Sequence, residues 1–219
     1  HNAVMRPLEQ LKAKGCTYTM IPVNDRGELR LELLPGLLKP DTRAIVMTHA
    51  SNMCGAILPV LEIGRFCREK GLYFILDAAQ TAGHLELDMA SLGADALIVS
   101  GHKGLLGPQG IGVLMLSARF ARELVPLCTG GTGSRSENEI QPEFLPDRFE
   151  SGTPNAVGLA GLLSSLEWLN EQGIATIRSH EQALCAELLV GLSEISGIQI
   201  YGPQDAARQV ATVAFNIRG

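Results

Sequence analysis

Residues 73–80 read YFILDAAQ, and residues 96–104 read ALIVSGHKG. Each stretch is a short, nearly continuous apolar run that ends in polar residues. A strand without alternation of apolar and polar residues is buried on both faces of its sheet, which is typical of parallel sheets covered by helices. The two stretches therefore predict neighbouring central strands of an α/β fold, with Asp77 and Ser100 at their carboxyl ends.

The sequence around these stretches alternates strand-like and helix-like segments. Pro59–Lys70 has apolar residues at helical spacing, and Gly71 follows as a stop signal. The other predicted elements of the first half are strands at Thr17–Pro22, Ala44–Thr48 and Ile111–Leu116, and a helix at Leu31–Leu38. Strands separated by helices indicate an α/β fold with a largely parallel sheet.

The second half predicts a change of architecture. Residues 129–155 are rich in Gly, Ser, Pro and Glu, and a loop of this length is usually functional or disordered. Two long helices are expected next, at Ala156–Asn170 and Ile174–Ile195, followed by strands at Ile198–Tyr201 and Val210–Ile217. We therefore expect a large domain over residues 1–155. Residues 156–219 would be connecting helices and the start of a small α+β domain.

Composition excludes several classes of protein. The 219 residues are 46% hydrophobic and 19% charged with a net charge of −5, which predicts a soluble globular protein without the basic face that nucleic acids or anionic membranes require. No apolar run reaches the roughly 20 residues of a membrane span, and the sequence shows no basic, then apolar, then small-residue leader pattern, so the cytoplasm is the expected location. Five scattered cysteines without a Cys-x-x-Cys pair predict free thiols and no metal site.

Polar side chains gather where the two central strands end. In open parallel sheets, ligands bind beyond the carboxyl ends of the strands. The side chains expected at this rim are those of Asp77, Gln80, Ser100, His102 and Lys103. Pyridoxal 5'-phosphate needs such a set: a lysine for covalent attachment, a carboxylate for the pyridine nitrogen, and an amide, hydroxyl and imidazole for its oxygens.

Each of these residues alone has a simpler explanation. An Asp at the end of a strand usually caps a helix or forms a turn, a Lys in a glycine-rich turn is usually a solvated surface residue, and a single His is usually structural. Their occurrence together at successive strand ends favours the cofactor site over these separate explanations.

Five further stretches carry a resemblance to a known family. They are residues 1–4 (HNAV), 48–52 (THASN), 77–88 (DAAQ with Gly83-His84 and Asp88), 100–112 (SGHK with GPQGIG) and 148–155 (RFESGTPN). With these motifs the sequence resembles the class V aminotransferases, and within them the cysteine desulfurases and selenocysteine lyases. The resemblance covers essentially the whole chain and implies the fold of the aspartate-aminotransferase-like pyridoxal-phosphate transferases.

The resemblance implies a role for each matching residue around the cofactor ring. Lys103 would be the Schiff-base lysine and would later move the α-proton of the substrate. Asp77 would pair with the pyridinium nitrogen, and Gln80 would bond the phenolic oxygen. His1 would stack on the ring as a second catalytic residue, and Asn52 would contact the ring or the substrate.

The resemblance also implies how the phosphate is bound. Ser100 and His102 would hold the phosphate within the subunit. Thr153 would reach the phosphate of the neighbouring subunit's cofactor, which implies a homodimer. For His49, His84 and Asp88 we favour structural roles. Cys54 does not lie where the family keeps its sulfur-accepting cysteine, and for Cys128, next to the 129–155 loop, we do not favour a direct role on the substrate.

The implied reaction converts L-cysteine to L-alanine and passes the sulfur to an enzyme cysteine, from which a sulfur-acceptor protein could receive it. The family's nucleophilic cysteine and carboxylate-binding arginine are expected beyond Gly219, and its first phosphate loop before His1, so we expect a fragment of a longer enzyme. Other reactions of the family, namely transamination, selenocysteine lysis and epimerisation, remain open. So does an inactive fragment that only folds and dimerises.

Overall fold

A four-stranded sheet forms the centre of the molecule in the computed structural model, which describes residues 1–218. The strands β1 (Ala44–Thr48), β2 (Tyr73–Asp77), β3 (Ala96–Ser100) and β4 (Gly112–Leu116) lie in this order. The first three are parallel and β4 is antiparallel to β3. The predicted α/β fold with a mostly parallel sheet is confirmed. The last strand runs antiparallel because its connection, residues 101–111, contains no crossover helix.

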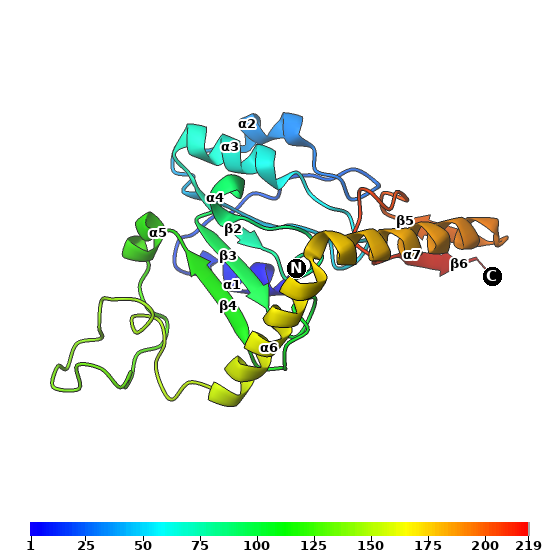
Figure 1. The fold of residues 1–219 in the computed structure, drawn as a ribbon. Coiled ribbons are helices and arrows are strands. Elements are labelled where there is room, and N and C mark those ends of the chain that lie inside the picture. The colour runs from blue at the N-terminus through cyan, green and yellow to red at the C-terminus, as the bar shows by residue number, and fades with distance from the viewer. Residues whose placement is uncertain (219) are drawn as a thin grey trace.

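Helices cover the sheet and supply much of the core. The helices of this part are α1 (Asn2–Lys12), the 3-10 turn η1 (Leu31–Leu33), α2 (Leu34–Leu37), α3 (Val60–Lys70), α4 (Met89–Leu92) and α5 (Ala118–Glu123). In Figure 1, α2, α3 and α4 lie together on one side of the sheet. Ile63 of α3 and Phe74 and Leu76 of β2 are completely buried. As predicted, α3 ends at Gly71, which adopts a left-handed conformation with φ of 67°.

Two predictions for the first half need correction. The strand expected at Thr17–Pro22 is absent, because this segment is largely exposed and pairs with no strand among residues 1–218. Only an isolated bridge, Val23 to Leu29, follows it. The helix expected at Leu31–Leu38 divides into η1 and α2. Pro35 has no amide hydrogen and fits only the first turn of a helix, so α2 begins afresh just before it.

The C-terminal part consists of two long helices and a strand pair. These are α6 (Ala156–Gln172), α7 (Ile174–Glu194), β5 (Ile198–Tyr201) and β6 (Ala214–Ile217), and the strands are antiparallel. Figure 1 shows α6 and α7, in yellow and orange, leading away from the sheet toward β5 and β6. Residues 124–155 contain neither helix nor strand, as the composition predicted. The proposed domain boundary at residue 155 stays a prediction.

The long helices expose many apolar side chains. Buried positions of α6 include Leu162 and Leu169, whereas Val157 is 86% and Leu163 is 58% exposed. In α7 the exposed apolar side chains include Leu184 and Leu188. These helices are apolar on more than one face, which indicates surfaces suited to further packing. Among residues 1–218, no helix combines the length and hydropathy needed to cross a membrane.

Candidate active site

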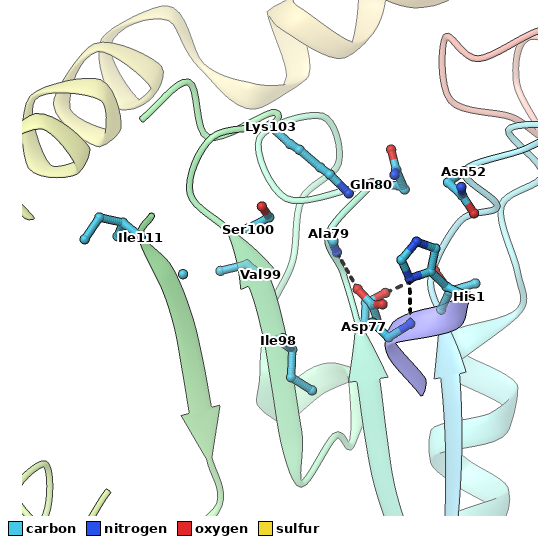
Figure 2. A pocket seen from close by; sticks show the side chains of 13 residues that line it. His1, Asn52, Asp77, Ala79, Gln80, Ile98, Val99, Ser100, Lys103 and Ile111 are labelled. Carbon is cyan, nitrogen blue, oxygen red and sulfur yellow. Dashed lines mark hydrogen bonds between the residues drawn. The ribbon is translucent and has the colours of Figure 1, made fainter. Parts of the chain in front are cut away.

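One edge of the sheet gathers the ends of all four strands. The register pairs Thr48 with Asp77 at the ends of β1 and β2, and Ser100 at the end of β3 with Gly112 at the start of β4. A cavity of about 290 Å³ opens at this edge (Figure 2). Its size is near the lower end of the range for small-molecule sites. The fold therefore places a pocket at the carboxyl ends of the parallel strands, where such sheets bind ligands.

Six of the eight predicted site residues line this pocket: His1, Asn52, Asp77, Gln80, Ser100 and Lys103. They come from the N-cap of α1, from the last residues of β2 and β3, and from the segments that follow β1, β2 and β3. In Figure 2 the Lys103 side chain points across the pocket toward the side on which Asp77, Gln80 and His1 lie. An amine, a carboxylate, an amide and an imidazole thus converge on one volume.

Asp77 is half-buried at the end of β2, where its main chain and its side chain both accept hydrogen bonds. One carboxylate oxygen, Oδ1, accepts a hydrogen bond from the Ala79 amide at 3.0 Å (Figure 2). The Asp77 carbonyl accepts from the His49 amide at 2.8 Å. A carboxylate fixed in this way keeps one orientation toward the pocket, which an electrostatic partner of a bound ligand requires.

Lys103 lies in a turn that short hydrogen bonds close. The Leu106 amide donates to the Lys103 carbonyl at 2.8 Å, and the Gly107 amide donates to the Gly101 carbonyl at 2.7 Å. Glycine is required at Gly104, because a Cβ atom there would lie 2.3 Å from the Ala82 carbonyl oxygen. Lys103 therefore extends from a compact turn that packs directly against the segment after β2.

His1 reaches the pocket from the beginning of α1. Its ring nitrogen Nδ1 accepts a hydrogen bond from the Ala3 amide at 3.1 Å, so the imidazole is the N-cap of this helix. This bond fixes the ring orientation and leaves the other edge of the imidazole available to a ligand. Figure 2 shows the ring on the same side of the pocket as Asn52.

Two predicted residues do not line the pocket. His102 is exposed in the turn, and its Nδ1 lies 3.3 Å from the Ser100 hydroxyl oxygen, which does line it. Thr153 is exposed just before α6, at the end of the long segment 124–155. The predicted phosphate role of His102 and the predicted contact of Thr153 with a neighbouring subunit stay predictions.

Of the three residues expected to be structural, Asp88 and His84 have side-chain partners and His49 is buried. Asp88 is the N-cap of α4, since its Oδ1 accepts from the Ser91 amide at 2.6 Å. His84 pairs with Glu181 of α7 through Nδ1, at 2.8 Å. His49 is buried, and its Nδ1 has no hydrogen-bond partner among residues 1–218. Burial lowers the pKa of His49 to about 4, so this imidazole is neutral. Neither Cys54 nor Cys128 lines the pocket.

The sequence prediction missed the apolar wall of the pocket. Ile98 and Val99 of β3 and Ile111 before β4 line it opposite the polar groups. Their position next to Ser100 and Gly112 at the strand ends was the available signal. An apolar wall beside convergent polar groups is the usual composition of a site for a small molecule or cofactor.

The chain matches known proteins over its whole length. The aminotransferase class V family matches residues 1–219. A protein of Methanothermobacter thermautotrophicus named "Probable cysteine desulfurase" is 35% identical over 219 residues, covering 99% of this chain and 54% of that protein. A cysteine desulfurase of Escherichia coli O157:H7 is 36% identical over 222 residues, covering 99% and 53%. The chain thus spans about half the length of these curated relatives.

A solved structure shares the fold. The apo structure of a cysteine desulfurase from Thermococcus onnurineus NA1 superposes with a TM-score of 0.92 and 34% sequence identity, over 100% of this chain and 55% of that chain. The fold, with its lysine turn at the sheet edge, is therefore that of the pyridoxal-phosphate-dependent transferases. Within this class, the chain belongs to the class V aminotransferase family.

Proposed function

We propose that the pocket binds pyridoxal 5'-phosphate and belongs to a cysteine desulfurase. The observation that carries the proposal is the convergence of the Lys103 amine and the Asp77 carboxylate on one cavity at the sheet edge. The chemistry of the lining fits the cofactor: an amine for its aldehyde, a fixed carboxylate for its ring nitrogen, and an apolar wall for its ring.

When bound, the cofactor supplies an electron sink that stabilises negative charge on the substrate's α-carbon. The protein's own contribution is attachment, orientation and proton transfer. Lys103 would provide the covalent attachment through Nζ and would serve as the base that moves the α-proton of the substrate. Asp77 would keep the ring nitrogen protonated through its negative charge. Gln80 would donate to the phenolic oxygen, and His1 and Asn52 would cover the ring and the substrate.

The phosphate would be held at the Lys103 turn. The Ser100 hydroxyl lines the pocket, and His102 lies within 3.3 Å of that hydroxyl, so a small rotation of its ring would add a second donor. Charge-assisted hydrogen bonds of this kind are stronger than those between neutral groups. This arrangement would fix one end of the cofactor while Asp77 fixes the other.

The proposed substrate is L-cysteine, and the products are L-alanine and sulfur bound to a cysteine of the enzyme. The names of the relatives support this choice. Because the chain spans about half of their length, we place the nucleophilic cysteine and the arginine for the substrate carboxylate in the remaining part of the protein. A sulfur-acceptor protein would then take the sulfur from the enzyme.

We further propose a homodimer in which Thr153 contacts the partner's cofactor. The exposed apolar side chains of α6 and α7, including Val157 and Leu163, support an additional interface. A cytoplasmic location is supported by the five cysteines, all of which are free thiols.

The test is product analysis with the full-length protein. Purified protein is incubated with pyridoxal 5'-phosphate, L-cysteine and a dithiol, which reduces the enzyme persulfide and releases its outer sulfur as sulfide. Alanine and sulfide are quantified beside a Lys103→Ala control. Equal amounts of alanine and sulfide, absent from the control, support the proposal. Amino transfer to a keto acid without alanine from cysteine would replace desulfuration by another reaction of the family. Turnover of selenocysteine alone, or epimerisation of the amino acid without alanine formation, would also replace desulfuration by another reaction of the family.

A further inference from the structure

A side-chain pair joins helix α7 to the pocket-forming part of the chain. Glu181 of α7 accepts from His84 Nδ1 with both carboxylate oxygens, at 2.8 and 2.9 Å. The two side chains are 22% and 28% exposed, so the pair is largely shielded from water. Because an ionised carboxylate can only accept, His84 carries a hydrogen on Nδ1, and its ring orientation is fixed from α7.

The other edge of the His84 ring lies against the Lys103 turn. A Cβ atom at Gly104 would lie 2.3 Å from His84 Nε2 and 2.5 Å from its Cδ2, so the ring edge packs on the Gly104 backbone. Gly83 contacts the same residue, since a Cβ there would lie 1.9 Å from the Gly104 carbonyl oxygen. Gly104, which follows Lys103, is therefore enclosed by Gly83 and by the His84 ring that Glu181 orients.

We infer that Glu181, acting through His84, is a positioning residue that fixes the turn carrying Lys103. The inference rests on the proposed role of Lys103. In the chain of contacts, Glu181 orients the imidazole, the imidazole supports Gly104, and Gly104 sets the direction in which Lys103 leaves the backbone. Helix α7 thereby connects the C-terminal part of the chain to the reactive amine, although neither Glu181 nor His84 lines the pocket.

A second set of contacts shows why this pair matters for the turn. Residues 101–107 are closed internally by the Leu106 and Gly107 amide hydrogen bonds, which span only the turn itself. On its far side, Gly107 packs against Leu162 of α6. Loss of the His84 support removes the side-chain contact on Gly104. The Lys103 side of the turn then keeps only its internal hydrogen bonds, the Gly101 amide bond to the Ile111 carbonyl and the backbone contacts with Ala82 and Gly83, while the α6 side stays anchored.

The first experiment measures amide hydrogen exchange by NMR in the purified protein without cofactor. In Glu181→Ala, the Leu106 and Gly107 amides are expected to exchange about tenfold faster, because a charged hydrogen bond contributes about that factor to a local opening equilibrium. The Leu97 amide in the central sheet should be unchanged. The matched control is Glu187→Gln, on an exposed position of the same helix.

The second variant keeps the shape of the side chain. Glu181→Gln retains an acceptor oxygen without the charge and is expected to restore most of the protection lost in Glu181→Ala. His84→Ala should reproduce the exchange pattern of Glu181→Ala, and the double variant should add nothing further, since both residues act in one chain of contacts.

The cofactor readout is the yield of borohydride-trapped pyridoxyl adduct on Lys103 at subsaturating pyridoxal 5'-phosphate. The inference predicts a severalfold lower yield in Glu181→Ala and normal yield in Glu187→Gln. Unchanged exchange at Leu106 and Gly107, or equally faster exchange at Leu97, would overturn it, since the pair would then be inert or merely stabilising. If wild-type protein forms no adduct, the proposed function fails, while the exchange data still decide the positioning role.

Discussion

Gly104 brings the lysine turn against the segment after β2 because it has no side chain. In Gly104→Ala the new methyl group would meet the Ala82 carbonyl oxygen and the His84 ring, each at 2.3 Å. We expect displacement of the turn, a loss of about 2 kcal/mol in the free energy of unfolding, and at least a tenfold loss of cofactor attachment. Denaturant unfolding and adduct yield measure both effects.

The control for this variant is Gly131→Ala, where no atom lies within 4 Å of the added methyl group. Gly131→Ala should change neither the free energy of unfolding nor the adduct yield. Normal adduct formation in Gly104→Ala would mean that the turn accommodates a side chain and that Lys103 does not depend on this close contact.

Asp77 is expected to act through its charge. Asp77→Asn keeps the size of the side chain and the acceptor for the Ala79 amide, but removes the negative charge that would keep the ring nitrogen protonated. We predict about a hundredfold or greater loss of turnover at saturating cofactor, with little change in stability. Steady-state kinetics of alanine formation measures it. Turnover equal to wild type would show that another acid serves the ring nitrogen.

The residues of the pocket differed in how far sequence could predict them. Asp77, Ser100 and Lys103 follow buried strands directly, so strand geometry alone brings them to one edge. His1 and Asn52 were found only by resemblance, since nothing local in their segments places them at this edge. The roles of His102 and Thr153 depend on ring rotation and on another subunit, which strand patterns do not specify. The link from Glu181 to His84 joins residues 97 positions apart and left no local signal.

At the scale of elements, α3 packs closely on α4 through Gly64. A Cβ atom at this position would lie 1.8 Å from the Leu92 carbonyl oxygen. Gly64→Ala should therefore force α3 away from α4 and lower the free energy of unfolding by about 2 to 3 kcal/mol, despite the better helix propensity of alanine. Urea unfolding monitored by circular dichroism measures the change.

Gly191 provides the comparison within a helix. It lies inside α7 with open space around its Cβ position, so Gly191→Ala should be neutral or stabilising by up to about 1 kcal/mol. Equal effects of the two substitutions would mean that the contact between α3 and α4 relaxes at little cost.

Elements with strong local signals were predicted well. The two central strands, α3 with its glycine stop, and the long helices α6 and α7 all occur close to their expected bounds. The strand predicted at Thr17–Pro22 does not form, because strand propensity is not sufficient when no neighbouring strand is available for hydrogen-bonded pairing. The apolar pattern of β4 could not predict its antiparallel direction, since that direction depends on the path of residues 101–111.

At the scale of the whole molecule, stability should depend on the neutral state of His49. Burial lowers its pKa from 6.5 to about 4 in the folded protein. Below pH 6.5 the His49 imidazole binds a proton in the unfolded chain but not in the folded protein. The contribution of His49 to stability is therefore complete above pH 6.5 and falls as the pH approaches 4. The shift corresponds to about 3 kcal/mol over this window. Denaturant unfolding between pH 7 and 4 measures it.

The control for this dependence is His49→Gln, which has no titrating group and should flatten the slope between pH 6.5 and 4. Asp95 acts at lower pH. Burial raises its pKa, but hydrogen bonds from Arg119, Ser117 and the Phe74 amide outweigh this effect and hold the pKa below 3.8. Its contribution is therefore lost only as the pH falls below about 4. If His49→Gln keeps the wild-type slope of stability between pH 6.5 and 4, groups other than His49 cause that pH dependence.

Lys103 is the amine that we propose to carry the cofactor. The most direct measurement is to incubate the full-length protein with pyridoxal 5'-phosphate, reduce it with borohydride, and locate the pyridoxyl group by peptide mass spectrometry. We expect one labelled site, Lys103, and no label at that position in Lys103→Ala. Label on one of the other four lysines of this chain, Lys12, Lys14, Lys39 or Lys70, with Lys103 unmodified, would contradict it.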